Sequence, residues 1–145
     1  MAAKRAAARA APVPLAERLS VAGAPWLAPA RARVEAAWRA GRFPHALLIA
    51  GRPGLGQSEL GLWCAQFAFY EAAAGRPCGG CPACVLFLAG NHPDLRCVTF
   101  EDEASVIKVE QIRDLTAALA MHSYRGGRQV GLIDPADGMN TSSFN

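Results

Sequence analysis

Apolar residues recur along the chain at two spacings, and the longer spacing predicts three helices. In the clearest case Ile112, Leu115 and Leu119 fall on one helical face. The stretch Ser58–Tyr70 is apolar on nearly every side, which is typical of a buried helix. The predicted helices are Ala30–Ala40, Ser58–Tyr70 and Val109–Met121.

Shorter apolar runs between these stretches predict β-strands at His45–Ala50, Leu95–Phe100 and Gln129–Ile133. Strands that alternate with helices of this length are typical of an α/β fold with a parallel sheet flanked by helices. In such sheets, binding sites gather at the carboxyl ends of the strands. The loops after Ala50 and Ile133 are therefore the places where we expect chemistry.

The first 25 residues differ from the rest of the chain in composition. They are rich in alanine, and four prolines interrupt the first thirty residues: Pro12, Pro14, Pro25 and Pro29. Because proline disrupts helix interiors and central strands, we expect regular structure to begin only after these positions. The sequence thus predicts a flexible extension over residues 1–25 and one domain over residues 26–145.

Charge and cysteine content narrow the function classes. The 145 residues carry 15 basic and 12 acidic side chains, and residues 1–22 alone hold the whole excess of +3. The neutral remainder excludes a strongly basic nucleic-acid-binding body. No apolar run approaches the roughly 18 residues of a membrane span, so we expect no membrane partner. Five cysteines, three of them crowded together, favour a reducing compartment, and we predict a cytoplasmic protein.

A glycine-rich segment directly follows the predicted strand His45–Ala50. Its sequence GRPGLGQS matches the phosphate-loop pattern G-x-x-x-x-G-K-[ST] except at one position, through Gly51, Gly54, Gly56, Gln57 and Ser58. In this motif backbone N–H groups bind phosphates, the lysine neutralises their charge and the hydroxyl holds Mg²⁺. Gln57 replaces the lysine, and a neutral amide cannot offset the charge of phosphoryl transfer. This replacement counts against ATP binding and hydrolysis.

The end of the third predicted strand carries a second altered motif. Asp134 follows an apolar strand, where a phosphate-loop ATPase needs a carboxylate for Mg²⁺. Pro135 stands where a glutamate that activates water commonly follows. Two altered positions in two separate motifs indicate a domain that kept its architecture and lost hydrolysis. We therefore predict a degenerate nucleotide site and assign no catalytic residue.

A Gly/Pro/Cys-rich insertion over residues 76–84 predicts a metal site. Cys78, Cys81 and Cys84 form two overlapping C-x-x-C steps, whose thiolates can converge on one Zn²⁺. Structural zinc takes four ligands, and the candidates for the fourth are Cys64, Cys97 and His92. No acidic group bears a motif relation to these cysteines, so the predicted zinc is structural rather than catalytic.

These motifs occur together in the order that they take in one family. FPHALLI at 43–49, the phosphate-loop segment, the cysteine run, NHPD at 91–94, VEQIRDLTAAL at 109–119 and RGGRQVGLIDPADGMN at 125–140 resemble the delta-prime subunits of the bacterial DNA polymerase III clamp loader. The resemblance runs from about Trp26 to Asn145.

The resemblance implies an AAA+ fold of the phosphate-loop type and a place in a five-subunit ring with the delta and gamma/tau subunits. In that family the ring hydrolyses ATP on gamma/tau and places the sliding clamp on primed DNA. Delta-prime subunits often serve as the rigid stator. This chain would then be a non-catalytic subunit of the DNA polymerase III holoenzyme, a nucleotidyltransferase complex.

The chain also departs from the family pattern. By spacing, Phe69 stands at the position of the family's first zinc cysteine. The two further strands, the helical lid and the collar domain that follow in the family are absent from this chain. The strand at His45–Ala50 would lose both of its neighbours, which leaves backbone groups unpaired. We therefore interpret the chain as a fragment or truncated gene product, with poor stability of its own.

Two other functions remain open at this point. One is an active phosphate-loop ATPase that tolerates Gln57, and the other is a small zinc-dependent DNA-binding module. Turnover of ATP that depends on Asp134 would favour the first. Zinc content together with salt-sensitive DNA binding would favour the second.

Overall fold

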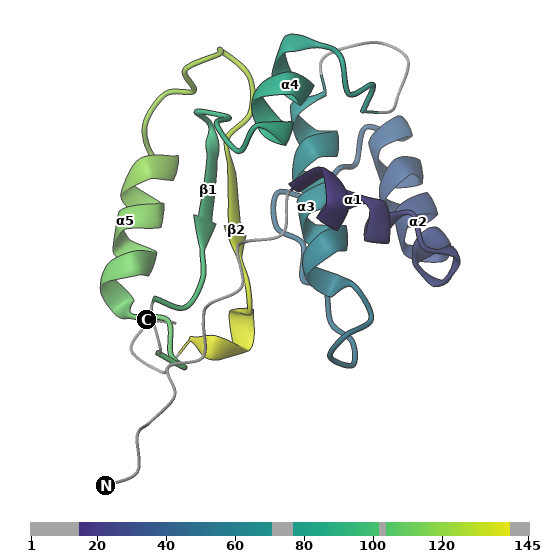
Figure 1. Cartoon of the computed structure of the whole chain (residues 1–145). Helices are drawn as coiled ribbons and strands as arrows, with labels where there is room; N and C mark the ends of the chain where they lie inside the picture. Colours follow the sequence, from purple (N-terminus) through teal and green to yellow (C-terminus); the bar gives the residue numbers. More distant parts are fainter. Residues whose placement is uncertain (1–14, 71–76, 102–103, 140–145) are drawn as a thin grey trace, which may run out of the picture.

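The computed structural model describes residues 15–70, 77–101 and 104–139 (Figure 1). Within them the chain forms five α-helices, two β-strands and two short 3₁₀ helices. Their order is α1 (Leu15–Ala22), η1 (Pro25–Leu27), α2 (Ala28–Arg39), α3 (Gln57–Phe69), α4 (Pro82–Leu88), β1 (Leu95–Val98), α5 (Val109–Leu119), β2 (Val130–Ile133) and η2 (Ala136–Gly138). None of the helices in these ranges is long and apolar enough to cross a membrane.

The two strands form a parallel sheet that lies between α3 and α5 (Figure 1). The register pairs Leu95 with Val130 and Val98 with Ile133. Successive residues of a strand face opposite sides. A Cβ built on Gly131 would lie 3.0 Å from Leu115 of α5, whereas the Leu132 side chain reaches α3 at Gly61. The predicted parallel sheet with flanking helices is therefore confirmed in this part of the chain.

The core consists of three apolar clusters, one on each side of the sheet and one farther along α3. Leu62, Phe69 and Phe87 join α3 to α4. Val98, Ile107 and Leu115 join α5 to the sheet. A third cluster of Leu27, Leu60 and Cys64 packs α2 against α3. Helix α3 contributes to two of the clusters, which accounts for its nearly uniform apolar sequence.

The prediction of a strand at His45–Ala50 is wrong. This segment joins no strand of the described sheet, and the side chains of Leu47 and Leu48 are 48% and 80% exposed. Ile49 alone turns inward and packs with the cluster of α2 and α3. A strand needs a hydrogen-bonded neighbour, and β2, the nearest described strand on α3, pairs only with β1 among the described residues.

The expectation that regular structure begins after Pro29 is also wrong. Within the predicted flexible extension of residues 1–25, Leu15–Ala22 forms α1, while residues 1–14 lie outside the described part. Leu15 and Leu19, four residues apart, pack on the cluster of α3 and α4. Pro25 and Pro29 lie in the first turns of η1 and α2, where a missing N–H costs nothing. The prolines start helices here instead of preventing them.

Candidate functional site: a degenerate nucleotide site and a cysteine cluster

The glycine-rich segment forms a tight loop that leads into the first turn of α3. Gly54 and Gly56 have φ angles of +83° and +91°, a left-handed conformation that glycine adopts without strain. Gly56 is the N-cap of α3, so Gln57 and Ser58 begin the helix. Correct spacing in the sequence thus places both side chains at a helix amino terminus, as a phosphate loop does.

Gln57 fills the loop with its own side chain. Its Nε2 donates a hydrogen bond to the backbone carbonyl of Arg52. The same nitrogen lies 3.1 Å from the position that a Cβ on Gly51 would take. The amide therefore closes the loop on itself, and the residue that replaces the lysine contributes no positive charge.

Ser58 and Asp134 lie together although they are 76 residues apart in sequence. The Ser58 hydroxyl donates a hydrogen bond of 2.9 Å to Asp134 Oδ1. Asp134 follows the last residue of β2, and its N–H donates to the Val98 carbonyl of β1. A cis peptide bond joins Asp134 to Pro135. The proline side chain has no acidic or basic group that could take part in catalysis. The structure thus assembles the two groups that would hold Mg²⁺ and bonds them to each other.

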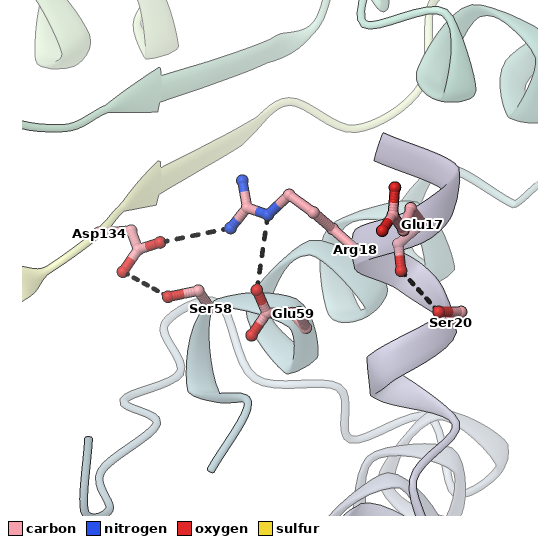
Figure 2. A network of polar contacts seen from close by, with 6 residues as sticks. All are labelled: Glu17, Arg18, Ser20, Ser58, Glu59 and Asp134. Carbon is pink, nitrogen blue, oxygen red and sulfur yellow. Dashed lines mark hydrogen bonds and ion pairs between the residues drawn. The ribbon is translucent and has the colours of Figure 1, made fainter. Parts of the chain in front are cut away.

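Arg18 is the member of this site that the sequence analysis missed. Figure 2 shows its guanidinium between α3 and the end of β2. Its Nε lies 3.5 Å from Glu59 Oε1, and its Nη2 lies 3.8 Å from Asp134 Oδ2. The Leu15–Leu19 spacing could have indicated an amphipathic turn there. No pattern in the sequence could have paired Arg18 with carboxylates 41 and 116 positions away.

The three clustered cysteines do converge, as predicted. The Sγ atoms of Cys78, Cys81 and Cys84 all lie within 4.8 Å of one another. Gly79, with a φ of +72°, makes the turn, and the Cys81 N–H donates to Cys78 Sγ at 3.2 Å. Such N–H bonds, from Gly80 and Cys81, lower the pKa of the Cys78 thiol. Thiolates in this arrangement suit a metal such as zinc.

The predicted fourth ligands do not join this cluster among the described residues. Cys64 is buried on α3, and burial raises the pKa of its thiol to about 11. His92 stacks on Phe69 with ring centroids 3.8 Å apart, and its Nδ1 accepts the Asp94 N–H. Cys97 is exposed on β1. Phe69 thus packs in the core against the candidate histidine.

Asp94, three residues beyond Asn91 in the NHPD motif, is a buried carboxylate with a structural role. Its oxygens accept the Tyr124 N–H at 2.8 Å, the Ser123 hydroxyl at 3.0 Å and the Arg125 N–H at 3.3 Å. Burial raises the pKa of Asp94, but these hydrogen bonds outweigh it and the net pKa is lowered. The carboxylate therefore ties the turn before β2 to the turn before β1.

Comparison with known proteins agrees with these motifs. A family model described as "DNA polymerase III, delta subunit" matches residues 28–145. The DNA polymerase III subunit delta' of Pseudomonas aeruginosa is 39% identical over 102 residues, which are 70% of this chain and 31% of that protein. The corresponding subunit of Escherichia coli is 34% identical over 113 residues, 77% of this chain and 34% of the relative.

A more distant relative is the DNA polymerase III subunit tau of Escherichia coli, 34% identical over 106 residues, 72% of this chain and 16% of that protein. The chain spans about a third of the length of the delta' relatives that it matches. The match nevertheless includes the glycine-rich loop, the cysteine cluster, the NHPD motif and Asp134, and it leaves out α1 and η1. The chain belongs to the DNA polymerase III delta-prime subunit family.

Proposed function

We propose that the protein acts as a non-hydrolysing delta-prime subunit, the stator of the DNA polymerase III clamp loader. In this role it helps a ring of delta and gamma/tau subunits to place the sliding clamp on primed DNA, in the cytoplasm. ATP would be hydrolysed on the gamma/tau subunits. The similarity to a tau subunit supports a common AAA+ architecture for the partners.

The observation that carries this proposal is the state of the phosphate loop. Gln57 bonds to Arg52 inside the loop and leaves it without the cation that phosphoryl transfer requires. Pro135, in the position of the usual glutamate, has no side chain that could activate water. A protein that keeps the glycine-rich loop at the start of α3 without these two groups suits a structural role in a ring of related subunits.

The test is nucleotide turnover and assembly measured on the same preparation. We expect no ATP hydrolysis by the purified full-length protein with Mg²⁺, and we expect it to complete a ring with purified delta and gamma/tau subunits. Because the protein has no catalysis to lose, Asp134→Ala should alter neither ATP hydrolysis nor ring assembly. Turnover by the unaltered protein that Asp134→Ala abolishes would establish an active ATPase and contradict the proposal.

The cysteine cluster has a structural task in this proposal. Cys78, Cys81 and Cys84 would hold Zn²⁺ and fix the turn that leads into α4. The three-thiol geometry supports this assignment. We expect about one zinc per chain by elemental analysis, lost in Cys81→Ser and retained in Cys97→Ser. Equal zinc contents in the two variants would contradict it.

A further inference from the structure

The amino-terminal helix α1 delivers a positive charge to the remnant of the nucleotide site. Arg18 lies between Glu59 and Asp134, with N–O distances of 3.5 and 3.8 Å (Figure 2). Its side chain is 33% exposed, and those of its partners are 22% and 34% exposed. Partial burial reduces the screening by water and salt that weakens ion pairs on open surfaces.

The position of Arg18 is held by packing on both sides of it in the sequence. Leu15 and Leu19 rest on the cluster of α3 and α4. With α1 anchored by these leucines, the Arg18 side chain extends from α1 toward Glu59 and Asp134 (Figure 2). The arginine is presented by a folded element rather than by a free tail.

The three oxygen-bearing side chains around Arg18 are of the kind that Mg²⁺ prefers. Two carboxylates and a hydroxyl are hard oxygen donors. In this structure, however, Ser58 is bonded to Asp134, and both carboxylates face the guanidinium. A divalent cation would have to displace Arg18 and break the bond between Ser58 and Asp134. The residues as arranged do not fit a metal ion.

We propose that Arg18 is the resident cation of this site and excludes divalent metal from Ser58, Glu59 and Asp134. Helix α1 is thus a built-in counter-ion that neutralises the acidic remnant after loss of the lysine and of nucleotide chemistry. The inference rests on the proposed function, since only a site without a catalytic task can be closed in this way. The inference goes beyond the proposed function because it assigns a role to the amino-terminal helix α1.

The experiment measures Mn²⁺ binding by electron paramagnetic resonance on the full-length protein without nucleotide. Arg18→Gln removes the charge and keeps Leu15 and Leu19, and Arg33→Gln removes the same charge from an exposed position on α2. We expect Arg18→Gln to bind Mn²⁺ at least about 10-fold more tightly than the unaltered protein. Arg33→Gln and Arg18→Lys should bind like the unaltered protein, and adding Asp134→Asn to Arg18→Gln should cancel the gain.

Equal Mn²⁺ affinity in folded Arg18→Gln and Arg33→Gln would overturn the inference. A second measurement does not depend on the folding of a variant. The Nε–Hε NMR signal of Arg18 in the unaltered protein should keep its position as Mg²⁺ is added to 10-fold excess over protein, and displacement of this signal would also overturn it. Failure of the proposed function would be recognised separately, as ATP turnover by the unaltered protein.

Discussion

Among single residues, Asp94 stabilises the fold through a defined set of hydrogen bonds. Its three hydrogen bonds join the turn at Ser123–Arg125 to the start of β1. Asp94→Asn exchanges a charged acceptor for a neutral amide and leaves part of this set unpaired. We expect it to lower the free energy of unfolding by about 1–3 kcal/mol. Urea denaturation measures this, with the exposed Asp114→Asn on α5 as the control.

The pH dependence of the same residue has a defined sign. The pKa of Asp94 is lower in the folded protein than in the unfolded chain, so the unfolded chain binds the proton more readily. The stabilisation is complete above the ordinary pKa of an aspartate and is lost as the pH falls through the lowered folded pKa. Asp94→Asn should therefore flatten the acid side of the stability curve. An unchanged acid slope would contradict the role of this carboxylate.

Cysteine reactivity tests the contrast between Cys64 and Cys78. Burial raises the pKa of Cys64 to about 11, whereas N–H donors from Gly80 and Cys81 lower that of Cys78. Since the thiolate is the nucleophile, iodoacetamide at pH 8 should label Cys78 well before Cys64 in native, metal-free protein. Peptide mass spectrometry measures the two rates, and denatured protein serves as the control because the difference should disappear there. Equal rates in native protein would refute the contrast.

Among the elements, α1 is the one whose contribution is hardest to infer from sequence. Leu19→Ala removes a half-buried side chain that packs between α1 and α3. We expect a loss of about 1–2 kcal/mol in the free energy of unfolding, less than for a fully buried leucine. Leu48→Ala is the matched control because Leu48 is 80% exposed, and it should cost less than about 0.5 kcal/mol. Similar losses in both variants would mean that α1 does not pack as described.

Sequence patterns predicted the elements that carry strong periodicity or a motif. Helix α5 was predicted from the spacing of Ile112, Leu115 and Leu119. The two phosphate-loop motifs predicted that Ser58 and Asp134 serve one site, and the two side chains are hydrogen-bonded in the structure. The failures have physical causes. An apolar run such as His45–Ala50 indicates β-propensity, but a strand forms only where a neighbour supplies hydrogen bonds. Arg18 escaped notice because contacts between distant segments leave no local periodicity.

The metal site shows the same difference between local and long-range contacts. The C-x-x-C steps sit on a single turn, so local sequence sufficed to bring the three thiols together. A fourth ligand would come from elsewhere in the fold, and spacing alone could not distinguish Cys64, Cys97 and His92. Among the described residues none of the three joins the cluster: Cys64 packs in the cluster of α2 and α3, His92 stacks on Phe69, and Cys97 is exposed on β1.

In the whole molecule, the described sheet is small for the helices that cover it. Helix α3 contacts Leu132 of β2 and Ile49 of the unpaired segment, with a Cβ on Gly61 lying 3.1 Å from the first and 3.9 Å from the second. One helix thus contacts both β2 and a segment that belongs to no strand of the described structure. Sheets of two strands are marginal by themselves, so the packing of α3 and α5 must supply most of the stability.

Amide hydrogen exchange on the 145-residue chain tests this picture. The segment Ala46–Ala50 belongs to no described strand, and Leu48 within it is exposed to water. The amides of this segment should therefore exchange within about 10-fold of the unfolded rate. The amides of Val130 and Asp134, which donate to Asp94 and Val98, should be protected by more than about 100-fold. Strong protection of Ala46–Ala50 in the 145-residue chain would contradict the unpaired state, because backbone N–H groups are protected only when they are bonded or buried.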